Sequence, residues 1–146
     1  MNEIIIKKFE TPDETRIFEK GKFELVKLKD MIIGRAIYEP GWKWSLDVSP
    51  LSGTEFCEIE HYGIVLSGKA TVAFPKGKIH VLNKGDLFFV SADPHDSWVL
   101  GDEEYISLHF LGAEKYAKKY LIFIHTLCNI NIYLLCFFYR LLFLTN

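Results

Sequence analysis

The segment HYGIVLSGKATVAFPKGKIHVLNKGDLFFV, residues 61–90, decides the fold. Its short apolar runs are separated by turn sequences at residues 67–68, 75–77 and 83–86. Runs of β-branched and aromatic residues that are bounded by Gly, Pro, Asn and Asp are typical of strands joined by turns. The segment therefore predicts a succession of short strands.

The same pattern continues in both directions from this segment. We expect strands over residues 23–28, 31–39, 42–44, 56–66, 69–74, 79–82, 87–90, 97–100 and 105–110. Short strands at such close intervals predict an all-β sandwich or barrel. Helix signals lie only at the ends: residues 11–14 have the form of a capping box with Pro at the first helical position, and residues 113–120 suit one short turn.

Composition excludes several function classes. The 146 residues suit one domain, and a hydrophobic fraction of 49% beside 25% charged residues allows a buried core. A formal net charge of −2 without a basic stripe disfavours nucleic-acid binding through phosphate contacts. The sequence shows no glycine-rich phosphate loop and no nucleotide-binding fingerprint.

The cysteines indicate a reducing compartment. Cys57, Cys128 and Cys136 are an odd number at wide spacing, which gives no disulfide framework. Residues 1–8 carry charges where the apolar core of a secretory signal would lie. The sequence therefore predicts a cytoplasmic protein in which Cys57 is a free thiol.

The C-terminal segment, residues 120–146, differs from the globular residues 1–119. Arg140 is its only formally charged residue, and it is dominated by Leu, Ile, Phe and Tyr. Three interpretations stay open: a tail anchor that holds the domain at the cytoplasmic face of a membrane, a packed helix, or a mistranslated end that no fold has shaped. About 24 residues at roughly 1.5 Å each would cross a bilayer. Asn129 and Asn131 in mid-span oppose the anchor, because buried amides without partners are costly.

Two motifs within residues 41–110 resemble the cupin superfamily. HYGIVLSG, residues 61–68, matches the second half of the first cupin motif, with His61 where the family usually has Glu. GDLFFVSADPHDSW, residues 85–98, is similar to the second motif and places His95 at its closing histidine. The resemblance implies a double-stranded β-helix, the cupin-type jelly-roll barrel, and is greatest to small, mostly uncharacterised single-domain cupins.

The resemblance also implies a metal site in the barrel. Counting back from His61 places Cys57 and Glu55 where the family has its His-x-His pair. In a continuous strand these residues share one face, so all would point inward with His61. Gly63 would then leave a gap above the site for a ligand.

The metal implied by the family is a divalent ion: iron, manganese, nickel or zinc. Two histidines with a carboxylate and open positions suit iron, manganese or nickel, whereas a cysteine-rich ligand set favours zinc. His80 and His109 lie outside both motifs, and we expect them to be structural or surface residues.

Four further residues are candidates for the pocket. Asp47 stands where members of the small-cupin group often have His, so it is either a substitute ligand or a turn residue. Trp42, Trp44 and Trp98 either line a pocket for an apolar ligand or fill the core.

Three functions remain open. The first is a metal-dependent enzyme on a small organic molecule, with Glu55 or Asp47 as base. The second is a non-catalytic module that senses or carries a small ligand. The third is a structural homodimerisation barrel with a vestigial site, which pairs through a sheet face or through the apolar residues 4–6.

Overall fold

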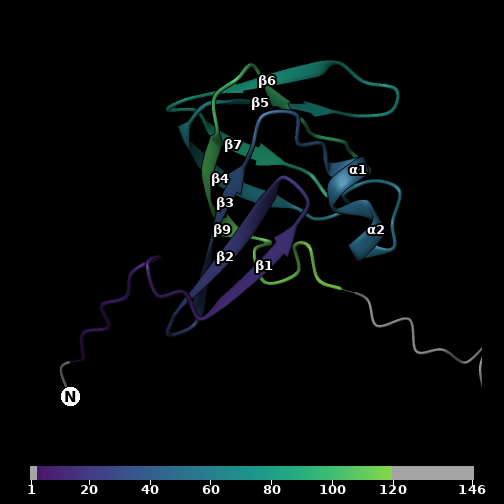
Figure 1. The fold of residues 1–146 in the computed structure, drawn as a ribbon. Coiled ribbons are helices and arrows are strands. Elements are labelled where there is room, and N and C mark those ends of the chain that lie inside the picture. The colour runs from purple at the N-terminus through teal and green to yellow at the C-terminus, as the bar shows by residue number, and fades with distance from the viewer. Residues whose placement is uncertain (1–2, 120–146) are drawn as a thin grey trace, which may run out of the picture.

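Two antiparallel sheets face each other in the computed structural model, which describes residues 3–119 (Figure 1). The elements are β1 (Glu14–Phe18), β2 (Gly21–Leu28), β3 (Met31–Tyr38), α1 (Trp44–Asp47), α2 (Ser49–Ser52), β4 (His61–Ser67), β5 (Lys69–Ala73), β6 (Ile79–Asn83), β7 (Leu87–Val90), β8 (Val99–Leu100) and β9 (Tyr105–Leu111). The predicted all-β fold of the double-stranded β-helix type is confirmed.

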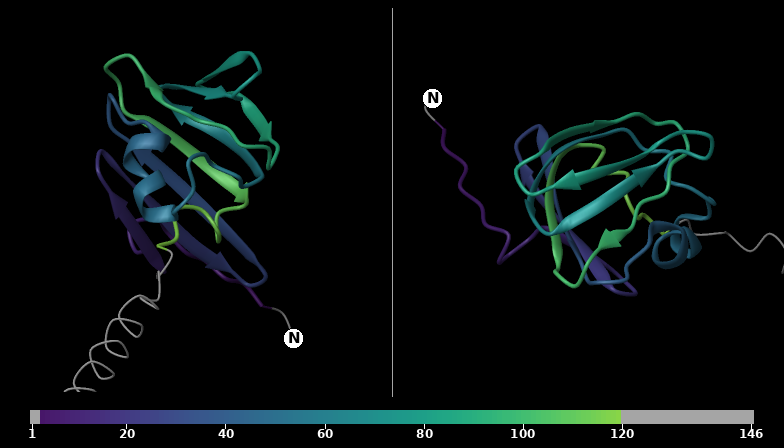
Figure 2. Two further views of the ribbon diagram at one scale, coloured as in Figure 1. Left: turned by 90° about the vertical axis from the view of Figure 1, so that its right-hand side faces the viewer. Right: turned by 90° about the horizontal axis from the view of Figure 1, so that it is seen from above.

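The larger sheet has six strands in the order β1-β2-β3-β9-β4-β7, and the smaller sheet has the order β6-β5-β8. β9 lies between β3 and β4, so the last strand closes the sheet between strands from the first and middle parts of the chain. Viewed from above, the two sheets curve around a common interior (Figure 2). α1 and α2 lie at one side of the barrel (Figure 1).

Three isolated bridges extend the smaller sheet. The segment 95–98 pairs with Ala73 beside β5, and on its other side with Lys43 and Cys57, which lie outside the named strands. The backbone of this segment is therefore hydrogen-bonded on both sides. Because flanked backbone cannot shift without breaking these bonds, the segment is held firmly against the barrel interior.

The core lies between the sheets and is closed by the last turn of the described chain. Phe23 and Ala36 oppose each other in the β2–β3 ladder, and both are fully buried. Arg16 of β1 donates hydrogen bonds to the carbonyls of Ala113, at 3.3 Å, and of Tyr116. These bonds hold the turn over the open end of the core, where Tyr116 packs on Phe23 at 4.6 Å between ring centroids.

Three local predictions were wrong. The expected helical start at residues 11–14 is instead a bend that leads into β1 at Glu14. Asp13 accepts a hydrogen bond from Lys27 N at 2.7 Å, which ties this bend to β2. The expected strand at residues 42–44 gives way to α1 at Trp44. The expected strand over residues 56–66 begins only at His61, since bends occupy residues 54–56.

Within residues 3–119 the structure has no helix that is long and apolar enough to cross a membrane. The interpretations of residues 120–146 lie outside the described residues.

Gly112 and Gly53 offer a matched test of the packing around the site. Both have positive φ angles, 81° and 72°. A Cβ on Gly112 would collide with the carbonyl oxygen of Glu60, next to His61, whereas a Cβ on Gly53 would have nothing within 4 Å. We expect Gly53→Ala to lower the free energy of unfolding by about 1 kcal/mol, the cost of the left-handed conformation. Gly112→Ala should cost about 1–3 kcal/mol more, because the backbone must shift.

Urea unfolding of both variants measures the difference. Equal losses of stability would contradict the close approach of the Gly112 backbone to Glu60.

Candidate metal centre

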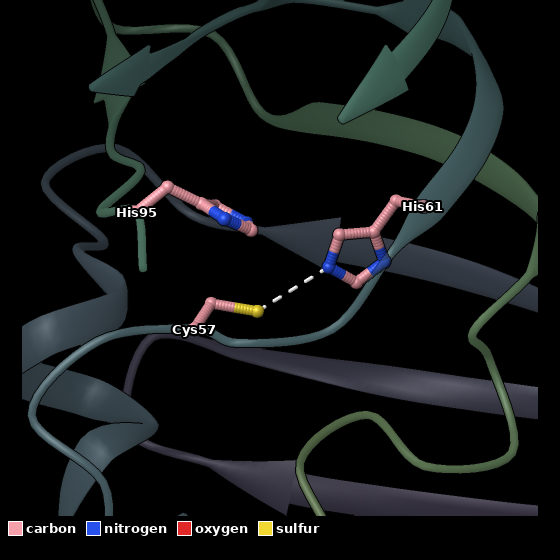
Figure 3. Close-up of side chains that lie close together, drawn as sticks. All are labelled: Cys57, His61 and His95. Carbon is pink, nitrogen blue, oxygen red and sulfur yellow. Dashed lines mark hydrogen bonds between the residues drawn. The ribbon is translucent and has the colours of Figure 1, made fainter. Parts of the chain in front are cut away.

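Cys57 and His95 face each other across a backbone pair. The amide of Cys57 donates to the carbonyl of His95 at 2.9 Å, and the amide of His95 donates to the carbonyl of Cys57 at 3.0 Å. Residues in such a reciprocal antiparallel pair have neighbouring side chains on the same face. Both side chains are buried and point to the barrel interior (Figure 3).

His61 reaches the same point from the larger sheet. It begins β4, where it opposes Val90 of β7, and its side chain is buried. Its Nε2 lies 3.3 Å from Cys57 Sγ (Figure 3). One ligand atom each from Cys57, His61 and His95 lie within 4.8 Å of one another, the only group of this kind in the described residues 3–119. The cluster therefore spans the two sheets.

The ring of His95 is fixed by a second contact. Its Nδ1 lies 2.8 Å from the carbonyl oxygen of Asp93, which can only accept a hydrogen bond. This contact assigns the ring proton to Nδ1 and leaves Nε2 as a free lone pair. Metal-binding histidines are commonly oriented by such a bond from the nitrogen that does not coordinate.

A small cavity adjoins the cluster. It has a volume of about 50 Å³. It is lined by Tyr38, Trp42, Trp44, Cys57, His61, Val72, Leu82, Phe88, Val90, His95, Ser97, Tyr105, His109 and Tyr116. None of these residues is Asp, Glu, Lys or Arg, so the cavity wall carries no permanently charged side chain.

Burial keeps the three groups neutral at neutral pH. Desolvation lowers the pKa of His61 well below its ordinary value, with smaller effects of His109 and His95. Desolvation also lowers the pKa of His95. It raises the pKa of the Cys57 thiol to about 12. Neutral imidazoles are ready ligands, whereas the thiol must lose its proton as it coordinates an ion.

The residues present fit a divalent metal ion. Zinc–sulfur and zinc–nitrogen bonds of about 2.3 and 2.0 Å in a tetrahedron separate the ligand atoms by roughly 3.3–3.6 Å. The 3.3 Å between Cys57 Sγ and His61 Nε2 matches this separation, and every pair in the group lies within 4.8 Å. Small rotations of the side chains would complete the site. Three protein ligands leave one position open for a water or a ligand.

Glu55 lies apart from the other residues proposed as ligands. Its side chain is exposed and is not part of the cluster. The period-2 argument assumed an extended chain, but residues 54–56 bend and so break the alternation between Glu55 and Cys57. Gly63 does not leave an open gap either, because the ring of Phe88 occupies that space.

The candidate pocket residues divide into two pairs. Trp42 and Trp44 both line the cavity and are fully buried. Asp47 is buried but accepts a hydrogen bond from Lys43 N at 2.7 Å, so it stabilises the start of α1 and does not line the cavity. Trp98 is half-buried outside the cavity, with Lys43 Nζ 5.5 Å from its ring centroid.

His109, Tyr38 and Tyr116 are among the cavity residues that sequence reasoning missed. His109 was expected to be structural or a surface residue, yet its ring centroid lies 5.3 Å from that of His61. The hydroxyl groups of Tyr38 and Tyr116 share a hydrogen bond of 2.8 Å. The period-2 pattern Tyr105-Ser107-His109 in β9 could have shown that His109 points inward. No local pattern marks Tyr116.

Comparison with known proteins supports the fold but not a family. No protein-family model matches the chain, and no curated protein matches it in sequence. A structure of unknown function from Rhizobium leguminosarum is similar with a TM-score of 0.54 and 16% identity, over 74% of this chain and 95% of that one. A polyketide cyclase from Streptomyces resistomycificus has a TM-score of 0.52 and 13% identity, over 73% and 77%. A protein of unknown function from an Acinetobacter species has a TM-score of 0.50 and 11% identity, over 68% and 90%. At such identities the likeness shows the fold alone.

The buried histidines predict a loss of stability in mild acid. Burial lowers the pKa of His109 to about 4, while an unfolded histidine titrates near 6.5. Between these values the unfolded state binds more protons, so the free energy of unfolding falls as the pH is lowered through this window. At pH 5 the buried, neutral His109 lowers the free energy of unfolding by about 2 kcal/mol relative to pH 7 or above.

Urea unfolding of the metal-free chain at pH 7, 6 and 5 measures this effect. His109→Gln should give a shallower dependence on pH than the wild type. Parallel dependences in the two proteins would show that His109 is not held neutral.

Proposed function

We propose that this chain is a cupin-type protein that binds a divalent metal through Cys57, His61 and His95, and a small organic molecule in the adjoining cavity. One observation carries the proposal. A buried sulfur and two buried imidazoles converge from both sheets on one point beside a cavity. A hydrogen bond between Cys57 Sγ and His61 Nε2 explains why these two side chains meet, but it does not explain why His95 lies beside them. Nδ1 of His95 is bonded to the carbonyl of Asp93, so its Nε2 is free to bind an ion.

The ligand set favours zinc among the four metals considered. A thiolate is a soft ligand and two imidazoles are borderline, a combination that suits zinc and disfavours manganese. The carboxylate that would have favoured iron, manganese or nickel is missing from the group, since Glu55 is exposed. A bound zinc ion would supply Lewis acidity at its open position.

The cavity favours a binding module over an enzyme that needs a carboxylate base. Both carboxylates considered as bases lie away from the cavity: Glu55 is exposed, and Asp47 is engaged with Lys43 N. The cavity-lining histidines and cysteine are the remaining titratable groups besides tyrosines. Apart from the metal ligands and His109, the cavity therefore offers a bound ligand no carboxylate or imidazole that could accept a proton.

A second candidate function is homodimerisation, which the outer face of the larger sheet supports. Tyr62 opposes Phe89, and Ile64 opposes Leu87, in the β4–β7 ladder. Leu87 is 76% exposed and Phe89 54% exposed. The outward positions of β4, β7 and β9 are all apolar: Tyr62, Ile64, Leu66, Leu87, Phe89, Ile106, Leu108 and Phe110. Since the part of this face formed by β4, β7 and β9 carries no charge to repel an identical surface, a second copy of the chain is the partner that we propose for it.

The metal proposal predicts near-equimolar metal in the protein as purified without a histidine tag. In His61→Ala/His95→Ala the bound metal should fall at least tenfold, because two of three ligands are removed. Cys57→Ser should retain less than the wild type, since a hydroxyl is a poor ligand for zinc. Elemental mass spectrometry of the full chain measures all three.

His80→Ala is the matched control, because His80 is exposed and outside the cluster. It should keep the metal content of the wild type. Circular dichroism checks that every variant is folded. A folded wild type that holds no metal, and takes none up from added zinc, would overturn the assignment of the site.

The dimer proposal predicts that Leu87→Lys/Phe89→Lys is a monomer. Two charges placed on the apolar face would have to be buried in the dimer at a cost of several kcal/mol. Sedimentation equilibrium should give twice the chain mass for the wild type and the single mass for this variant. Ile17→Lys, at the β1 edge of the sheet and away from β4, β7 and β9, should remain dimeric. A wild type that is monomeric at all concentrations would contradict the dimer proposal.

A further inference from the structure

Two buried indole groups in the cavity lack hydrogen-bond partners. Trp42 is 1% exposed and Trp44 is 3% exposed, and both line the cavity. The Nε1 atom of each is buried and has no acceptor within the described residues 3–119. Leaving such a donor unsatisfied is costly, and buried indole N–H groups usually find a partner. An acceptor that the chain does not supply is therefore expected in the cavity.

The surrounding packing fixes both indoles. Trp42 stacks on Tyr38 with ring centroids 3.8 Å apart and an interplanar angle of 13°. The amide of Trp44 donates to the carbonyl of Ser97 at 2.8 Å, which ties the residue to the segment that carries His95. Buried in these contacts, the indoles cannot swing out to solvent without breaking the core. A molecule that enters the cavity meets donors that are already in place.

The other unpaired polar atoms of the cavity are also ring nitrogens. Nδ1 of His61 and Nδ1 of His109 are both buried without a partner. The thiol proton of Cys57 is directed to His61 Nε2 when it forms their bond, which leaves the ring proton of His61 on Nδ1. In this tautomer of His61 the cavity residues Trp42, Trp44 and His61 each carry an unused N–H group, and no carboxylate lines the cavity. Such a wall selects a ligand rich in acceptor atoms.

The net charge of the metal with its three ligands restricts the charge of the bound molecule. A divalent ion with one thiolate and two neutral imidazoles leaves one net positive charge in a cavity without charged side chains. A buried charge without a counter-charge is costly. A ligand with one negative charge would neutralise the site, whereas a neutral or cationic ligand would not.

The volume sets the size of the ligand. The cavity of about 50 Å³ has room for roughly four water-sized groups. Val72, Leu82 and Val90 supply apolar wall beside the polar atoms. A space of this size favours a short chain with one polar end.

We propose that the cavity binds a small monocarboxylate of about the size of propionate, whose carboxylate oxygens accept hydrogen bonds from the indole N–H groups of Trp42 and Trp44. This inference rests on the proposed function, because the metal supplies the positive charge that the carboxylate balances. It names the ligand class and the two residues that recognise it. The competing explanation is that ordered water accepts the hydrogen bonds of the two indoles.

Indole N–H resonances report the binding directly. The zinc-loaded, ¹⁵N-labelled full chain is titrated with sodium propionate and, separately, with propionamide, which is nearly isosteric and uncharged. Trp42→Phe and Trp44→Phe assign the resonances. We expect saturable downfield shifts of the Trp42 and Trp44 indole protons with propionate, and no shift of Trp98, which lies outside the cavity. Propionamide should bind at least tenfold more weakly.

The variants test the two donors separately. Each of Trp42→Phe and Trp44→Phe should weaken propionate binding by about 10- to 100-fold, because each loses one hydrogen bond to a charged acceptor. Trp98→Phe is the matched control and should bind like the wild type. Zinc content is measured in every sample, so that loss of ligand binding is not confused with loss of the metal.

The outcomes separate this inference from the metal proposal. Zinc retained without a saturable indole shift overturns the carboxylate inference alone and leaves ordered water as the occupant. Zinc absent together with no shift overturns both. A saturable shift of both indole protons in a chain that holds no zinc supports the indole–carboxylate contact and overturns the metal site. Equal binding of propionate and propionamide overturns the proposed selectivity for a negative charge.

Discussion

The reciprocal backbone pair between Cys57 and His95 is the contact on which the candidate site depends. It joins the stretch after α2 to the segment before β8, and it extends the smaller sheet beyond its named strands. The same two hydrogen bonds place a thiol and an imidazole on one face. β4 of the larger sheet then brings His61 to them from the opposite side. The candidate ligand cluster is thus assembled by the closure of the barrel, so an open barrel would not bring these three side chains together.

The overall fold and part of the site could be predicted from sequence because both depend on local signals. Turns at residues 67–68, 75–77 and 83–86 separate strands whose observed bounds differ from the expected ones by at most one residue, except that β4 begins at His61 and not at residue 56. The motif positions of His61 and His95 identified two members of the cluster, and counting back identified Cys57. Glu55 fell outside the cluster because strand periodicity holds only for extended backbone, and the chain bends just before Cys57.

The rest of the site comes from packing between distant segments, which no local pattern records. Tyr116 enters the cavity because Arg16, a residue of the first strand, binds the carbonyls of the last turn. Residues 11–14 have the spacing of a capping box, yet the carboxylate of Asp13 among them accepts a hydrogen bond from the amide of Lys27 in β2. In each case a residue type was read for its commonest local role, and a partner far along the chain determined its actual one. Trp42 and Trp44 are a different case. Their rings pack as core residues, but their indole N–H groups have no hydrogen-bond partner within residues 3–119.

The position of Tyr116 has a consequence for where the domain ends. Its ring is part of the cavity wall, and its hydroxyl bonds to Tyr38 from a turn only three residues before Lys119. The pocket therefore depends on residues that follow the last described strand. A shortened chain that stops at Leu111 would keep every described strand and lose this wall. A truncation designed to keep the pocket intact therefore has to retain the turn that carries Tyr116 as well as β9.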